Sequence, residues 1–68
     1  MNASSHIAFQ RFTIDVEFSS GGDPYATQTY EVEAADWFLA EREALEMSVN
    51  SPYDNARIPD LSRRAIAR

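Results

Sequence analysis

Eight residues near the start of the chain alternate strictly between polar and apolar side chains. Phe12, Ile14, Val16 and Phe18 are separated by Arg11, Thr13, Asp15 and Glu17. A period of two with β-branched and aromatic residues is typical of a strand that buries one face. The run ends at residues 19–24, a cluster of serine, glycine, aspartate and proline that favours a turn. Alternation then resumes over residues 27–33, so the pattern predicts an antiparallel hairpin.

The period changes after the second alternating segment. Residues 35–49 are mostly alanine, leucine, glutamate, arginine and methionine, without glycine or proline, and they predict a helix. On a helical projection the apolar residues form two neighbouring stripes, one of Trp37, Ala40, Ala44 and Met47 and one of Phe38, Leu45 and Val49. Pro52 then disfavours helical angles at Ser51 and ends the helix.

The last third of the chain has a weaker pattern. Ile58, Pro59 and Asp60 are expected to open a short second helix that turns Leu61, Ala65 and Ile66 toward the rest of the molecule. The predicted fold class is therefore α+β, a two-stranded antiparallel hairpin packed on one amphipathic helix with a C-terminal extension. Residues 1–10 are expected to form a flexible N-terminus, 11–50 the β-β-α core and 51–68 the extension rich in proline and arginine.

A chain of 68 residues can bury only a small core. The two alternating segments and the two helix stripes supply its predicted members: Phe12, Ile14, Val16, Phe18, Tyr30, Val32, Phe38, Leu45 and Val49. This core is thin for an independent fold. Self-association, or pairing of an edge strand with another chain, would complete it, so a homo-oligomer is one expectation.

Charge is the most uneven property of the sequence. Eleven carboxylates against six basic residues give a formal net charge of −5. Asp15, Glu17, Glu31 and Glu33 are expected to share the outer face of the hairpin. Since alternate strand residues lie about 6.6 Å apart, these side chains would form a carboxylate patch that fits a basic protein surface, in effect a phosphate mimic. The alternative is that they only keep the outer face soluble.

Four arginines lie in the last twelve residues, at positions 57, 63, 64 and 68. They are expected to pair with acidic residues of the helix (Glu41, Glu43 or Glu46), to anchor a protein partner, or to bind nucleic acid. Because the overall charge opposes phosphate binding and no aromatic residues are interleaved, direct contact with nucleic acid is the least favoured of the three. Glu41 falls between the apolar stripes, where it requires water at the sheet edge or an arginine such as Arg57 or Arg63.

Aromatic residues suggest contact positions. Trp37 and Phe38 are adjacent on the helix and about 100° apart, so we expect that one of them is an exposed anchor or that both wedge against the sheet edge. Tyr25 and Tyr53, each beside a proline, are interpreted either as contact residues or as packing around turns. The predicted partner-binding residues are Asp15, Glu17, Glu31, Glu33, Trp37, Arg63 and Arg64.

Catalytic motifs are missing. The chain has no cysteine, a single histidine (His6), no phosphate-binding glycine loop and no paired metal-ligand spacing. We therefore expect no enzymatic activity, no cofactor and no metal. No apolar run approaches the roughly 18 to 20 residues needed to span a bilayer, and the N-terminus lacks the pattern of a secretion signal, so a cytoplasmic protein without membrane contact is expected.

Three function classes follow. The leading hypothesis is a non-enzymatic interaction protein that docks its acidic sheet face on a basic surface of a nucleic-acid-handling complex. All six basic residues are arginine and alanine is abundant, which fits a GC-rich genome such as that of many bacteria or their phages. In its small size, acidity and β-β-α order the chain resembles many phage accessory proteins, including inhibitors of host defence, and this resemblance implies a phage or mobile-element inhibitor that acts in the host cytoplasm. The second hypothesis is a structural or accessory subunit of a virion or other assembly, and the third is a small DNA-binding regulator.

Overall fold

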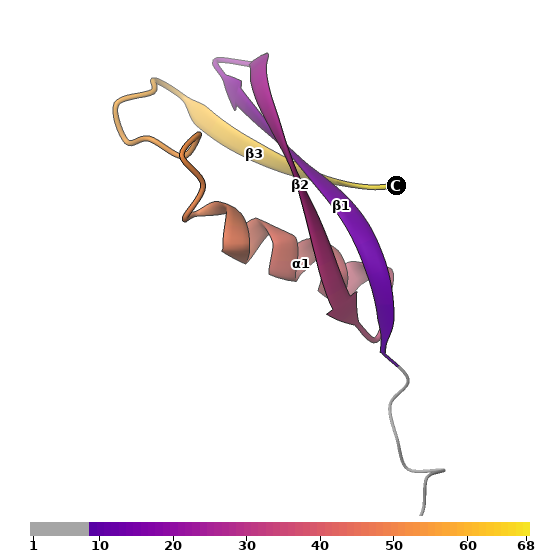
Figure 1. The fold of residues 1–68 in the computed structure, drawn as a ribbon. Helices are drawn as coiled ribbons and strands as arrows, with labels where there is room; N and C mark the ends of the chain where they lie inside the picture. Colours follow the sequence, from indigo (N-terminus) through magenta and orange to yellow (C-terminus); the bar gives the residue numbers. More distant parts are fainter. Residues whose placement is uncertain (1–8) are drawn as a thin grey trace, which may run out of the picture.

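The computed structural model describes residues 9–68 and contains four elements (Figure 1). They are β1 (Gln10–Ser20), β2 (Asp23–Ala34), α1 (Trp37–Ser48) and β3 (Leu61–Ala67). The strands form one antiparallel sheet in the order β2-β1-β3, and α1 packs on one of its faces. The α+β class is confirmed, whereas the expected two-stranded hairpin is corrected to a three-stranded sheet. Residues 1–8, including His6 and most of the predicted flexible N-terminus, lie outside the described residues.

β1 and β2 form the predicted hairpin in the register Ile14↔Tyr30. Gly21 and Gly22 make the turn with φ angles of 57° and 89°, which residues with a Cβ rarely adopt. The pairing shifts between Phe18 and Ser19, so that Tyr25 is the extra residue of a bulge.

The C-terminal segment is a strand, so the prediction of a short helix there is wrong. Residues 61–67 form β3, which pairs antiparallel with β1 from Ser20↔Leu61 to Ile14↔Ala67. A seven-residue helix is unstable alone, whereas a strand beside β1 satisfies backbone groups that would otherwise form an open edge. The entry into β3 is fixed by two hydrogen bonds, from the Gly21 amide to the Asp60 carbonyl (3.1 Å) and from the Ser20 hydroxyl to the Pro59 carbonyl (2.7 Å).

Helix α1 approaches the sheet through small side chains. Asp36 caps its start by accepting a hydrogen bond from the Leu39 amide at 2.9 Å. Ala40, Ala44 and Ser48 form the fully buried side of the helix. Within residues 9–68 no helix is long and apolar enough to cross a membrane.

The core differs from its prediction on the helix side. Phe38 and Val49, two predicted core members, are 69% and 51% exposed. Because alanine lets the helix lie close to the sheet, the larger residues of the second stripe are displaced toward its margin. Leu45 and Tyr30 are partly buried, and the strand prediction is otherwise confirmed, with a buried core of Phe12, Ile14, Val16, Phe18, Val32, Ala34, Ala40 and Ala44.

Candidate protein-interaction surfaces

The face of the sheet opposite the helix carries the four predicted carboxylates. Asp15 and Glu17 project from β1, and Glu31 and Glu33 project from β2. Arg11 lies among them and reaches both Glu31 and Glu33 at 3.4 Å. One guanidinium therefore serves two exposed carboxylates.

β3 brings two more arginines to this face. Arg64 lies 3.3 Å from Glu17, and Arg68 donates to Asp15 at 2.9 Å. Thr29 also donates to Asp15, at 2.6 Å. The hydrogen bond from Thr29, followed by that from Arg68, lowers the pKa of Asp15 below its ordinary value of 3.8.

The open face is thus nearly neutral rather than strongly acidic. Three guanidiniums lie among the four carboxylates and leave a local charge of −1. Pairing with the helix carboxylates is one of three interpretations that the sequence allows for the tail arginines, but Arg64 and Arg68 pair with carboxylates of the sheet. The sequence does hold a sign of this pairing. Arg64 and Arg68 are four residues apart, and in a strand this even spacing places both side chains on the same face of the sheet.

Arg63 points to the other side of the sheet. Its guanidinium donates to the hydroxyl of buried Ser48 at 3.1 Å and lies 3.4 Å from Asp54. Arg63 and Arg64 therefore belong to opposite faces and do not form one binding patch. Arg63 joins β3 to the end of α1.

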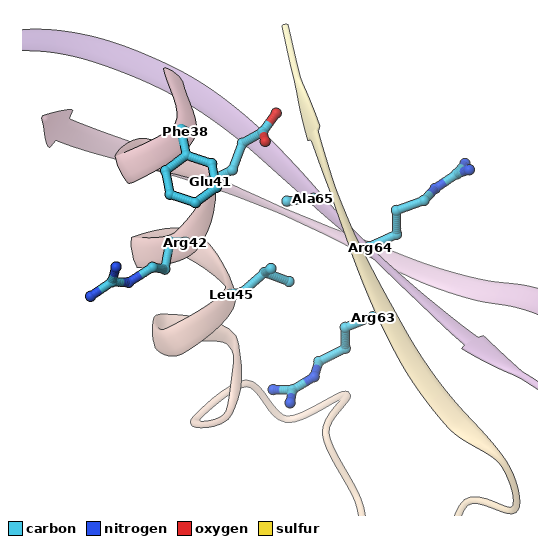
Figure 2. Close-up of a pocket in the computed structure, with 7 residues that line it drawn as sticks. All are labelled: Phe38, Glu41, Arg42, Leu45, Arg63, Arg64 and Ala65. Carbon is cyan, nitrogen blue, oxygen red and sulfur yellow. The ribbon is translucent and has the colours of Figure 1, made fainter. Parts of the chain in front are cut away.

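A shallow groove of about 390 Å³ runs between α1 and β3 (Figure 2). Phe38 and Leu45 from the helix and Ala65 from the strand provide its apolar walls, while the Arg42 guanidinium projects away from it. Glu41 lies beside Phe38 at the groove and forms no ion pair within residues 9–68. Of the two expectations for Glu41, pairing with Arg57 or Arg63 is not observed, and the partly exposed position at the groove agrees with the other, contact with water at the sheet edge.

Three aromatic residues have structural partners. The Trp37 ring lies 4.3 Å from that of Phe12, although 46% of the residue remains exposed. The Tyr25 hydroxyl donates to the Tyr53 carbonyl at 2.7 Å, and both rings pack against Phe18. Tyr25 and Tyr53 thus cover the end of the core at Phe18. Of the two adjacent helix residues, Phe38 is more exposed than Trp37.

A second hollow, of about 200 Å³, lies where β2 ends and α1 begins. Phe9 and Leu39, 66% and 40% exposed, give it an apolar floor together with Ala34 and Ala35. Its rim is charged and consists of Glu33, Arg42, Glu43 and Glu46. We call these eight residues the acid-rimmed hollow. Sequence reasoning misses Phe9 and Leu39, since the first precedes the alternating run and the second falls outside both helix stripes.

The negative charge of the molecule is concentrated in the segment from Glu31 to the end of α1, which forms most of this hollow. From Glu31 to the end of α1 there are six carboxylates, and Arg42 with the neighbouring Arg11 supplies two guanidiniums, which leaves −4. The other five carboxylates and four arginines of the chain leave −1. Four of the five net charges thus belong to this part of the fold.

No protein-family model, curated protein or solved structure matches the chain. The surface itself is therefore the basis for assigning a function.

Proposed function

We propose that this chain is a non-enzymatic protein-interaction module that binds a basic partner at the acid-rimmed hollow. The observation that carries the proposal is the coincidence of two properties at one place. Three carboxylates against one lining arginine surround the exposed apolar side chains Phe9 and Leu39, and one of them, Glu43, forms no ion pair within residues 9–68.

The hollow fits a partner that presents arginine or lysine next to aliphatic residues. The long apolar stem of such a side chain covers Leu39 and Phe9, and its charged end reaches Glu33 or Glu43. Charge-assisted hydrogen bonds beside an apolar floor are stronger than those on an open surface, because less water competes for them. Arg42 also lines the hollow and pairs with Glu46, 3.8 Å away. A partner that binds here must therefore keep this ion pair intact.

The proposed docking site lies at the acid-rimmed hollow and not at the middle of the open sheet face, where the sequence predicts it. Asp15 and Glu17 each have their own arginine partner within the fold, whereas Glu31 and Glu33 share one guanidinium, and Glu33 lines the hollow. Trp37 lies at the start of the same helix, and Arg63 and Arg64 act within the fold. We retain as part of the proposal that the partner belongs to a nucleic-acid-handling complex, and that the chain inhibits it as a phage or mobile-element product in the host cytoplasm.

A defined peptide of the expected chemistry tests the proposal and can stand in for the natural partner. The probe is a short synthetic peptide of alternating leucine and arginine, and its affinity is measured by calorimetry. Glu33→Gln with Glu43→Gln is expected to weaken binding about tenfold, since each lost charged contact is worth about 1 kcal/mol or less at an exposed site.

The matched control removes two carboxylates elsewhere. Asp23→Asn with Asp60→Asn lowers the net negative charge by the same amount, and both residues are exposed and outside the hollow. Wild-type affinity in this control supports the proposal. If both double variants bind the peptide equally weakly, the binding is non-specific charge attraction, and the proposal is contradicted.

A second candidate function is a subunit of a larger assembly. The exposed Phe38 ring, beside the groove between α1 and β3, favours it. In that case Phe38→Ala abolishes assembly, and added salt has little effect. The peptide measurement separates the candidates, because binding at the acid-rimmed hollow is predicted to be strongly salt-dependent.

A further inference from the structure

We infer that two copies of this chain pair through the free edge of β2 and form one continuous six-stranded sheet. This inference does not rest on the proposed function. β2 and β3 are the two edges of the sheet, because β1 lies between them. The two edges differ in where they carry the features with which proteins prevent edge pairing.

The β3 edge is protected in its middle, whereas on β2 the protecting features (Pro24, the bulge at Tyr25 and the carboxylates) lie toward the two ends of the strand. β3 has seven residues and two adjacent arginines, Arg63 and Arg64. Short length and charge are common protections of an edge strand. β2 has twelve residues and no charged side chain from Tyr25 to Tyr30. An exposed stretch of this kind is a template for another strand.

The hydrogen-bonding direction of β2 follows from a contact on the opposite side of β1. The Arg68 amide donates to the Thr13 carbonyl at 3.0 Å, so odd-numbered residues of β1 bond toward β3 and even-numbered residues toward β2. Even-numbered β2 residues opposite them bond inward. The N–H and C=O groups of Thr27, Thr29 and Glu31 therefore point to the free edge.

Charge selects the register of the pair. A two-fold axis at Thr29 places Thr29 opposite its own copy and Glu31 opposite Thr27, so no carboxylate faces another. An axis at Glu31 places two glutamates in direct opposition, and an axis at Tyr30 places them on a diagonal, within about 8 Å. The register centred on Thr29 keeps the two Glu31 side chains farthest apart among these three.

The same register covers an apolar hollow beside β2. Gln28, Tyr30, Met47 and Pro52 are among the residues that line this hollow of about 360 Å³. Residues 28 and 30 lie on the helix side of the sheet, since Ser51 after the helix donates to Gln28. In the pair, Tyr30 of one copy is opposite Gln28 of the other and covers the hollow. This burial adds to the small core.

Cross-linking tests the edge directly, because the chain has no cysteine. Thr29→Cys is expected to form a covalent dimer on mild oxidation, since hydrogen-bonded partners have Cα atoms about 5.5 Å apart, within disulfide range. Ser62→Cys, exposed on the β3 edge, is the control and is expected to remain monomeric on denaturing gels. Failure of Thr29→Cys to cross-link, or equal cross-linking of both variants, would overturn the inference.

A charge exchange tests the register. Thr27→Glu places a carboxylate opposite Glu31 at two symmetric positions, and we expect the dimer dissociation constant, measured by analytical ultracentrifugation, to rise about tenfold. Adding Glu31→Lys to that variant is expected to restore dimerisation. Unchanged dimerisation in Thr27→Glu, or no restoration in the double variant, would contradict this register. The Glu33→Gln, Glu43→Gln variant is expected to dimerise normally, so a failure of the peptide-binding proposal is distinguishable from a failure of this one.

Discussion

Arg63 and Arg64 are adjacent in the sequence but have different surroundings. The Arg63 side chain is 30% exposed and donates to buried Ser48, whereas the Arg64 side chain is 72% exposed and donates to Glu17. A charged hydrogen bond to a buried group contributes more to stability than an exposed ion pair.

We therefore expect Arg63→Met to lower the free energy of unfolding by about 1 to 2 kcal/mol. Arg64→Met, the control, is expected to change it by less than about 0.5 kcal/mol. Urea denaturation followed by circular dichroism measures both. Equal losses in the two variants would refute the different roles assigned to these arginines.

Asp15 gives the fold a pH dependence with a definite sign. Its pKa is lowered in the folded state, mainly by the Thr29 hydroxyl and then by Arg68. A lowered carboxyl pKa contributes stability that is present above the unfolded value of 3.8 and is lost as the pH falls through the folded pKa. Thr29→Val is expected to raise the pKa of Asp15 toward 3.8 in an NMR titration of its carboxyl carbon. An unchanged pKa in this variant would exclude Thr29 as the main cause.

At the scale of elements, β3 is the part for which the sequence-based prediction is wrong. The hairpin could be predicted because its alternation is strict and its turn contains two glycines. Residues 61–67 lack such a signal, since Leu61, Ala65 and the arginines are also good helix formers. Only the open edge of β1, a tertiary property, decides between strand and helix. The helix is located correctly from its composition, but its buried side depends on how closely Ala40 and Ala44 approach the sheet.

A proline pair tests the assignment of β3. The Ile66 amide points toward β1 and the Ala67 amide points to solvent, as the bond from Arg68 to Thr13 implies. Ile66→Pro is expected to destabilise the fold by about 2 kcal/mol through a lost ladder bond, while Ala67→Pro stays near wild type. Thermal denaturation compares the two, and equal melting temperatures would contradict the strand.

The packing of α1 is tested on its buried side. Ala44→Leu inserts volume between helix and sheet and is expected to cost about 1 to 3 kcal/mol of stability. Phe38→Ala removes a much larger side chain, yet we expect a smaller loss because that ring is mostly exposed. Chemical denaturation measures the free energy of unfolding of both variants. A larger decrease in Phe38→Ala than in Ala44→Leu would show that Phe38 belongs to the core and contradict this packing.

At the scale of the whole molecule, strand pairing decides where charge remains available. Once β3 lies beside β1, Arg64 and Arg68 pair with Glu17 and Asp15, and most of the net charge is left in the segment from Glu31 to the end of α1, which forms most of the acid-rimmed hollow. The sequence could predict the four carboxylates on one face, because their alternation is visible. The arginines among them and the contribution of Phe9 and Leu39 depend on pairings between residues far apart in the chain.

The most direct test of this account is an amide NMR titration of the ¹⁵N-labelled chain with the leucine–arginine peptide. We predict that the largest shifts occur at Phe9, Leu39 and Glu43, and that the Glu33→Gln, Glu43→Gln variant needs about ten times more peptide to reach half of its full shift. Shifts centred instead on Asp15, Glu17 and Arg64 would contradict the claim that internal pairing has removed that face from binding.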